Sequence, residues 1–138
     1  MKKTLKVLSL VLVAALSMVL LVACDISSKP ETVQKKLEGK GYEVEITKDA
    51  EDLAGIAEMY GLEEGDITAM LMAGKYDEED EDNDGEYISV IFFKNSATAK
   101  KFTDSDLYKQ MHAPNGGEKG RAGSVVYVGT AQAVKDAK

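Results

Sequence analysis

Acidic residues alternate along one short stretch of the chain and could bind a metal ion. Asp80, Asp82 and Asp84 are followed at once by Gly85. Alternate carboxylates supply the oxygen ligands that Ca²⁺ prefers, and a glycine allows a sharp turn behind them. The surrounding segment, residues 77–86, carries eight carboxylates in ten residues, and a divalent ion would relieve their mutual repulsion. Weak calcium binding is therefore one hypothesis for this segment.

A solvated turn is the other interpretation of the same segment. Asp80 to Gly85 resembles the opening of an EF-hand calcium loop, but position 12 of such a loop, normally a bidentate glutamate, falls on Ile91. No helices are expected on either side of it. The sequence Asn83-Asp84-Gly85 is typical of a turn, and charges at a hairpin tip keep a sheet edge from pairing with other chains.

The single cysteine, Cys24, closes an apolar stretch at the N-terminus. Three lysines precede an apolar region, residues 7–22, and residues 21–24 read Leu-Val-Ala-Cys. This arrangement resembles the signal peptide and lipobox of bacterial lipoproteins. A membrane-spanning helix is the alternative, but it normally needs about 20 apolar residues, more than this segment has.

The lipoprotein resemblance implies where the chain works. It implies diacylglycerol on the Cys24 sulfur, cleavage that removes residues 1–23, and anchoring at the outer face of the bacterial plasma membrane. Two or more long acyl chains make a stable anchor, since each buried methylene contributes about 0.8 kcal/mol. A lipidated Cys24 is no longer free for a disulfide, a thiolate metal site or nucleophilic catalysis.

The charge of the mature chain excludes some partners. Without residues 1–23 the chain has 14 basic and 24 acidic residues, a formal charge of −10. Such a domain is a poor partner for nucleic acid, and an anionic membrane surface should repel it rather than draw it flat. We therefore expect no nucleic-acid partner.

The remaining polar motifs offer little for catalysis. His112 is the sole histidine and has no acid at metal-ligand spacing. Residues 116–121 are glycine-rich and basic but lack the ending of a phosphate-binding loop. Glu63, Glu64 and Asp66 lie in a turn, where acids are usually solvated. Because neither a nucleophile with a base nor paired acids in a pocket stands out, we expect no enzymatic activity and no cofactor besides the calcium ion considered above.

Apolar periodicity and turn residues predict a single α+β domain behind a short tether. Residues 24–29 should form a polar tether, and residues 30–138 should form the domain. The expected elements are helix 30–38, strand 42–47, helix 49–60, strands 67–76 and 86–94, helix 96–110, strand 124–128 and a short helix from Thr130, with residues 111–123 as a loop. This order predicts a ferredoxin-like β-α-β-β-α-β antiparallel sheet with extra N-terminal and C-terminal helices.

Two of the expected strands are apolar on both faces. In residues 67–73 and 87–93, apolar side chains do not alternate with polar ones, so the sheet face away from the two long helices should also be covered. An extra terminal helix could cover it; a second copy of the chain or a partner protein docked on an exposed apolar patch are the alternatives.

The expected function is that of a membrane-anchored protein-interaction or accessory module. The alternatives are a weak calcium-binding module that uses the acidic tip and a small-ligand binder on the sheet face. The mature part, with its closing segment 125–131, also resembles small uncharacterised extracytoplasmic lipoproteins. That resemblance implies a ferredoxin-like domain and supplies no site residues.

Overall fold

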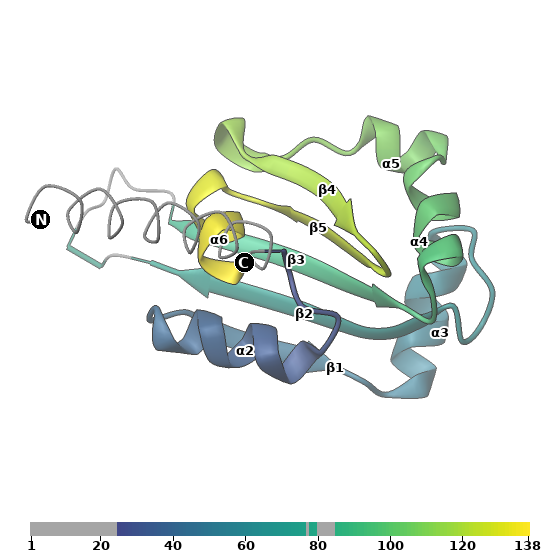
Figure 1. Ribbon diagram of the computed structural model, residues 1–138, viewed down its shortest axis with the longest axis horizontal. Helices are drawn as coiled ribbons and strands as arrows, with labels where there is room; N and C mark the ends of the chain where they lie inside the picture. The colour runs from purple at the N-terminus through teal and green to yellow at the C-terminus, as the bar shows by residue number, and fades with distance from the viewer. Residues whose placement is uncertain (1–24, 77, 80–84) are drawn as a thin grey trace, which may run out of the picture.

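A five-stranded antiparallel sheet forms the centre of the protein, with helices on both faces (Figure 1). The computed structural model describes residues 25–76, 78–79 and 85–138. The strands are β1 (Glu43–Thr47), β2 (Ile67–Lys75), β3 (Glu86–Phe93), β4 (Glu118–Ala122) and β5 (Val125–Gly129). The helices are α2 (Pro30–Gly39), α3 (Ala50–Met59), α4 (Ser96–Thr103), α5 (Asp106–Gln110) and α6 (Ala131–Ala137), with a 3-10 turn at Pro114–Gly116. The α+β class and the antiparallel sheet are thus confirmed.

Polar side chains mark where most of these helices begin. Asp49, Asn95 and Thr130 each accept a hydrogen bond from a backbone N–H in the first turn of α3, α4 and α6. Ser105 does the same for α5, accepting from the N–H of Tyr108. The expected single helix 96–110 is therefore two helices, because Ser105 starts a new one.

The order of the strands corrects the ferredoxin-like prediction. A split βαβ unit keeps its first two strands parallel and places another strand between them. Here β1 and β2 are direct antiparallel neighbours, and the sheet runs β1-β2-β3-β5-β4. The helix α3 joins two adjacent strands without crossing the sheet. Periodicity shows which side chains of a strand are apolar, but it carries no information on which strand pairs with which, and the prediction failed at that step.

The strand β4 lies in residues 111–123, which were expected to be a loop. Its residues are poor strand formers, and pairing with β5 imposes the extended conformation. A Cβ at Gly120 would come within 2.6 Å of the Tyr127 hydroxyl, so this glycine lets the Tyr127 ring lie over β4. The ammonium of Lys119 donates to the carbonyl of Tyr108 at 2.7 Å and ties β4 to α5.

One face of the sheet is covered by the two terminal helices, as one of the expectations had it. The helices α2 and α6 contact each other and bury apolar side chains against β2, β3 and β5. The Tyr42 hydroxyl donates to Asp136 at 2.8 Å, which links the start of β1 to α6. Burial raises the pKa of Tyr42, and the Asp136 carboxylate adds to this shift. The fully buried side chains on this face include Val33, Leu37, Leu71, Val90, Val125 and Val134.

The packed domain begins before α2. Ile26 is only 4% exposed and belongs to the core between the sheet and the helices α2 and α6. In Figure 1 the purple segment runs from the start of α2 toward α6. The segment that was expected to be a polar tether thus contains a core residue.

The helices α3, α4 and α5 pack on the other face, where they cover only one end of the sheet. Their core is centred on Phe102, whose ring lies 5.5, 5.4 and 5.7 Å from those of Tyr60, Phe93 and Tyr108. The strands contribute Ile67, Ile91, Phe93 and Val126 to this core. None of the helices in the described part of the chain covers the opposite end of the same face.

Candidate functional site

The uncovered end of the second sheet face carries the exposed apolar side chains of the strands. Cross-strand pairing aligns Glu45, Met72 and Ser89 in one row and Glu43, Gly74 and Tyr87 in the next. Their strand neighbours Val44, Ala73 and Ile88 point to the opposite face, into the core under α2 and α6. We call the set Glu43, Glu45, Met72, Gly74, Tyr76, Tyr87 and Ser89 the open sheet end.

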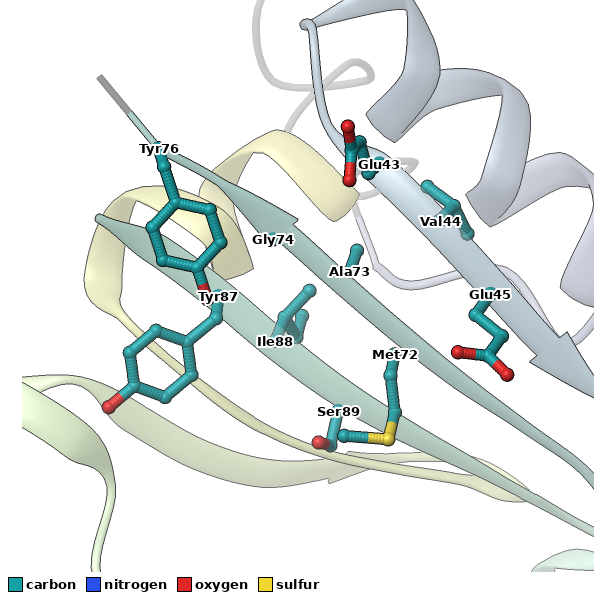
Figure 2. Close-up of a pocket in the computed structure, with 10 residues that line it drawn as sticks. All are labelled: Glu43, Val44, Glu45, Met72, Ala73, Gly74, Tyr76, Tyr87, Ile88 and Ser89. Atoms are coloured by element: carbon teal, nitrogen blue, oxygen red, sulfur yellow. The ribbon is translucent and has the colours of Figure 1, made fainter. Parts of the chain in front are cut away.

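The open sheet end is a shallow depression of about 510 Å³ (Figure 2). Tyr76 and Tyr87 lie at one end of it, Met72 and Ser89 lie further along β2 and β3, and the two glutamates follow β1. The side chains are accessible: Tyr76 is 70%, Met72 55% and Tyr87 39% exposed. Three of the five large apolar residues that are exposed in the described part of the chain therefore share one surface.

Gly74 lets the Tyr76 ring fold back over β2. A Cβ at Gly74 would lie 3.2 Å from the nearest ring carbon of Tyr76 and 3.5 Å from its hydroxyl oxygen. That approach is tighter than normal van der Waals contact, so a larger residue at this position would push the ring away. The glycine is thus part of the shape of the depression.

The electrostatic character of the open sheet end is acidic. Glu43 and Glu45 are exposed, and within the described residues neither has an ion-pair or hydrogen-bond partner. Two basic side chains of the sheet, Lys75 on β2 and Lys119 on β4, are engaged elsewhere. Lys75 donates to the carbonyl of Lys40 at 2.9 Å, and Lys119 is held by α5. Two uncompensated carboxylates therefore flank two tyrosine rings.

This arrangement is suited to binding. Tyrosine faces attract cations through the ring quadrupole, and carboxylates attract them directly. Aromatic side chains and methionine also gain free energy when a partner buries their apolar surface. In the described residues no group of three His, Cys, Asp or Glu side chains could hold a metal ion.

The residues that the sequence predicted to carry lipid or to bind calcium are not among the residues that the structure describes. Cys24 and the candidate calcium ligands Asp80, Asp82 and Asp84 lie outside the described residues. His112 is exposed in the segment between α5 and the 3-10 turn. The glycine-rich segment 116–121 leads into β4 and opens no helix.

Asp66 departs from the expectation of solvated turn acids. Its side chain is buried, accepts a hydrogen bond from the Glu63 N–H at 3.0 Å and forms an ion pair with Lys94 at 2.6 Å. The hydrogen bond from Lys94, together with that from the Glu63 backbone, holds the pKa of Asp66 below its usual range. The pair joins the start of β2 to the residue after β3, so its role is structural.

The sequence did contain a signal for the open sheet end. Residues 67–73 and 87–93 are apolar on both faces, and this pattern indicated an apolar surface that needed a cover. Tyr76 was missed because its ring reaches the surface by folding back over Gly74. Glu43 and Glu45 alternate with apolar residues in the expected strand 42–47, a pattern that indicates only the polar side of a strand.

No family model, no curated protein and no solved structure matches the chain. None of the helices in the described part of the chain is both long and apolar enough to cross a membrane.

Proposed function

We propose that the protein is a lipoprotein of the bacterial plasma membrane, anchored on its outer face through Cys24, and that the open sheet end binds a protein partner. The partner segment is apolar and carries lysine or arginine. One observation carries this proposal: exposed Tyr76, Tyr87 and Met72 lie beside two carboxylates that have no cation of their own among the described residues. A basic side chain of the partner supplies the missing charge and stacks on the rings.

The shape of the open sheet end favours a protein segment over a small molecule. Pockets for small ligands bury about 70–90% of the ligand surface. Here Tyr76 and Met72 are themselves more than half exposed, so a small ligand would be contacted from one side only. An extended segment or a loop of a protein covers such a surface and excludes water from it.

The charges disfavour a second copy of the chain as the partner. A symmetric dimer through the open sheet end would bring Glu43 and Glu45 of both copies together. Like charges in an interface cost free energy, and the mature chain carries a formal charge of −10 overall. A cationic partner meets no such repulsion.

The anchor is tested by replacing Cys24. We expect the unaltered protein to incorporate radiolabelled fatty acid and the Cys24→Ala variant not to. The matched control is Ser28→Ala, which leaves the cysteine in place. Fatty-acid labelling of the Cys24→Ala variant would contradict the anchor.

The binding surface is tested with defined peptides. A peptide of alternating lysine and leucine should shift the backbone NMR resonances of residues 43–45, 72–76 and 85–89 in the mature chain. The double variant Glu43→Gln, Glu45→Gln should bind it about 3- to 10-fold more weakly, since each exposed ion pair contributes roughly 0.2–1 kcal/mol. The control Glu51→Gln, Glu58→Gln has the same net charge and lies on α3. Equal binding of a glutamate–leucine peptide, or equal weakening by both double variants, would contradict the proposal.

A further inference from the structure

We infer that the layer formed by residues 25–40 and 130–138, which includes α2 and α6, faces the bilayer, where its lysines contact anionic lipid headgroups. We call this set the anchor layer. The inference rests on the lipid anchor at Cys24 proposed above and adds the orientation of the domain. It places the open sheet end on the side that points away from the membrane.

The length of chain between the lipid and the core sets the first constraint. Ile26 is buried in the core beneath α2 and α6, and Cys24 lies only two residues before it. Two extended residues span at most about 7 Å. A lipid on Cys24 therefore holds the anchor layer close to the headgroups, and the domain has no long tether on which to rotate.

The charge of the anchor layer is opposite to that of the rest of the domain. Residues 25–40 and 130–138 hold six lysines and four acidic residues, a formal charge of +2, whereas residues 41–129 hold eight basic and twenty acidic residues, a charge of −12. The lysines are Lys29, Lys35, Lys36, Lys40, Lys135 and Lys138, and all but Lys138, which is half-buried, are exposed. One of the four acids, Glu31, is paired with Lys48 and so contributes little repulsion.

Distance allows this local charge to prevail over the total charge of −10. The anchor layer is one helix thick, which puts the sheet and the residues behind it roughly 10 Å or more from the headgroups. At physiological ionic strength the Debye length is about 8 Å. Salt thus screens the acidic residues beyond the sheet from the bilayer more strongly than it screens the lysines of the anchor layer. Total charge alone predicts that an anionic membrane repels the domain, whereas the local charge of the anchor layer predicts that this layer is attracted.

The two faces of the sheet then have separate roles. Side chains alternate along β1, β2 and β3, so the open sheet end lies on the opposite face from Ile26, α2 and α6. When the anchor layer lies on the membrane, Tyr76, Tyr87 and Met72 are directed outward.

The orientation is tested with fluorescent probes on the lipidated protein. Lipidation occupies Cys24, so Gln132→Cys on α6 or Ser89→Cys in the open sheet end provides one free thiol for a fluorophore. The protein is reconstituted into phosphatidylcholine vesicles that contain about a third phosphatidylglycerol and a nitroxide-labelled headgroup. We expect quenching at position 132 to be severalfold stronger than at position 89, and to weaken in vesicles without phosphatidylglycerol.

Charge reversal separates local attraction from total charge. The triple variant Lys29→Glu, Lys35→Glu, Lys135→Glu should lose most of the extra quenching at position 132. The control Lys100→Glu, Lys101→Glu, Lys109→Glu changes the net charge equally, but on α4 and α5, and should retain the quenching. Equal quenching at positions 132 and 89, or equal losses in both triple variants, would overturn the inference while flotation with the vesicles still reports an intact anchor. Failure of the unaltered protein to float would instead overturn the anchor itself.

Discussion

At the scale of single residues, Asp66 contributes to stability in a way that depends on pH. It is the one buried carboxylate among the described residues, and it joins the turn after α3 to the end of the β2–β3 hairpin. The backbone N–H of Lys94 also donates to the Asp66 carbonyl at 2.9 Å, so the two residues are joined by a backbone hydrogen bond as well as by the ion pair. Because the folded protein lowers the pKa of Asp66, the carboxylate stabilises the fold fully above about pH 4, the usual pKa of an aspartate. This stabilisation is lost as the pH falls through the lowered value.

Replacing Asp66 by asparagine should expose this dependence. We expect Asp66→Asn to lower the free energy of unfolding at pH 7 by about 1 kcal/mol, a modest value because Lys94 is half exposed. The difference in the free energy of unfolding between the variant and the unaltered protein should shrink at acid pH, where Asp66 is protonated in both the folded and the unfolded state. Urea unfolding across this pH range measures it, with Glu64→Gln as an exposed control. A difference that stays constant across the range would show that the ion pair is not its source.

At the scale of elements, the N-terminal segment and the helices α2 and α6 form one packed layer. Ile26, Val33 and Leu37 share a core with α6, and the Lys36 ammonium donates to the carbonyl of Lys138 at 3.0 Å. The two ends of the domain therefore support each other on the first face of the sheet.

Shortening Ile26 should destabilise the whole domain. We expect Ile26→Ala to lower the free energy of unfolding by roughly 2–4 kcal/mol, as for other large-to-small core substitutions. Ser28→Ala, in the same segment but exposed, should change it by less than about 0.5 kcal/mol. If both variants unfold at the same urea concentration as the unaltered protein, the segment is a tether and not part of the core.

Local sequence predicted the elements better than their arrangement. The helices expected from residues 49, 96 and 130 and the strands expected at residues 67–76 and 86–94 agree with α3, α4, α6, β2 and β3. The start of α5 after Ser105 was not predicted, because a serine fits the surface of a helix as well as it fits a cap. The strand β4 was not predicted either, because it is extended only through its pairing with β5.

At the scale of the whole molecule, charge is distributed unevenly over a small acidic domain. The residues outside the anchor layer carry most of the acidic excess, and their mutual repulsion opposes folding. Salt screens this repulsion, and it also weakens the local pair between Asp66 and Lys94.

Raising the salt concentration should therefore stabilise the protein. We expect sodium chloride at about physiological ionic strength to raise the melting temperature of the mature chain by a few degrees over low salt. For a domain of this size, a gain of about 1 kcal/mol in the free energy of unfolding raises the melting temperature by about 4 °C. The rise should be larger in Asp66→Asn, which has no ion pair at this position to weaken. A fall in melting temperature with salt would mean that attractive pairs outweigh the acidic excess.

The sequence alone determined the character of the elements and their surface chemistry: where helices begin, which strands are apolar on both faces, and how acidic the mature chain is. These properties depend on residue type and on spacing over a few positions, and both can be read from the sequence itself. Only the tertiary structure decided that β1 and β2 are neighbours, that Ile26 belongs to the core, and that α3, α4 and α5 leave one end of the sheet open. The apolar residues of β2 and β3 and the glutamates of β1 can each be recognised in the sequence. That they meet in the open sheet end depends on the register of the strands, which the packing of the whole chain decides.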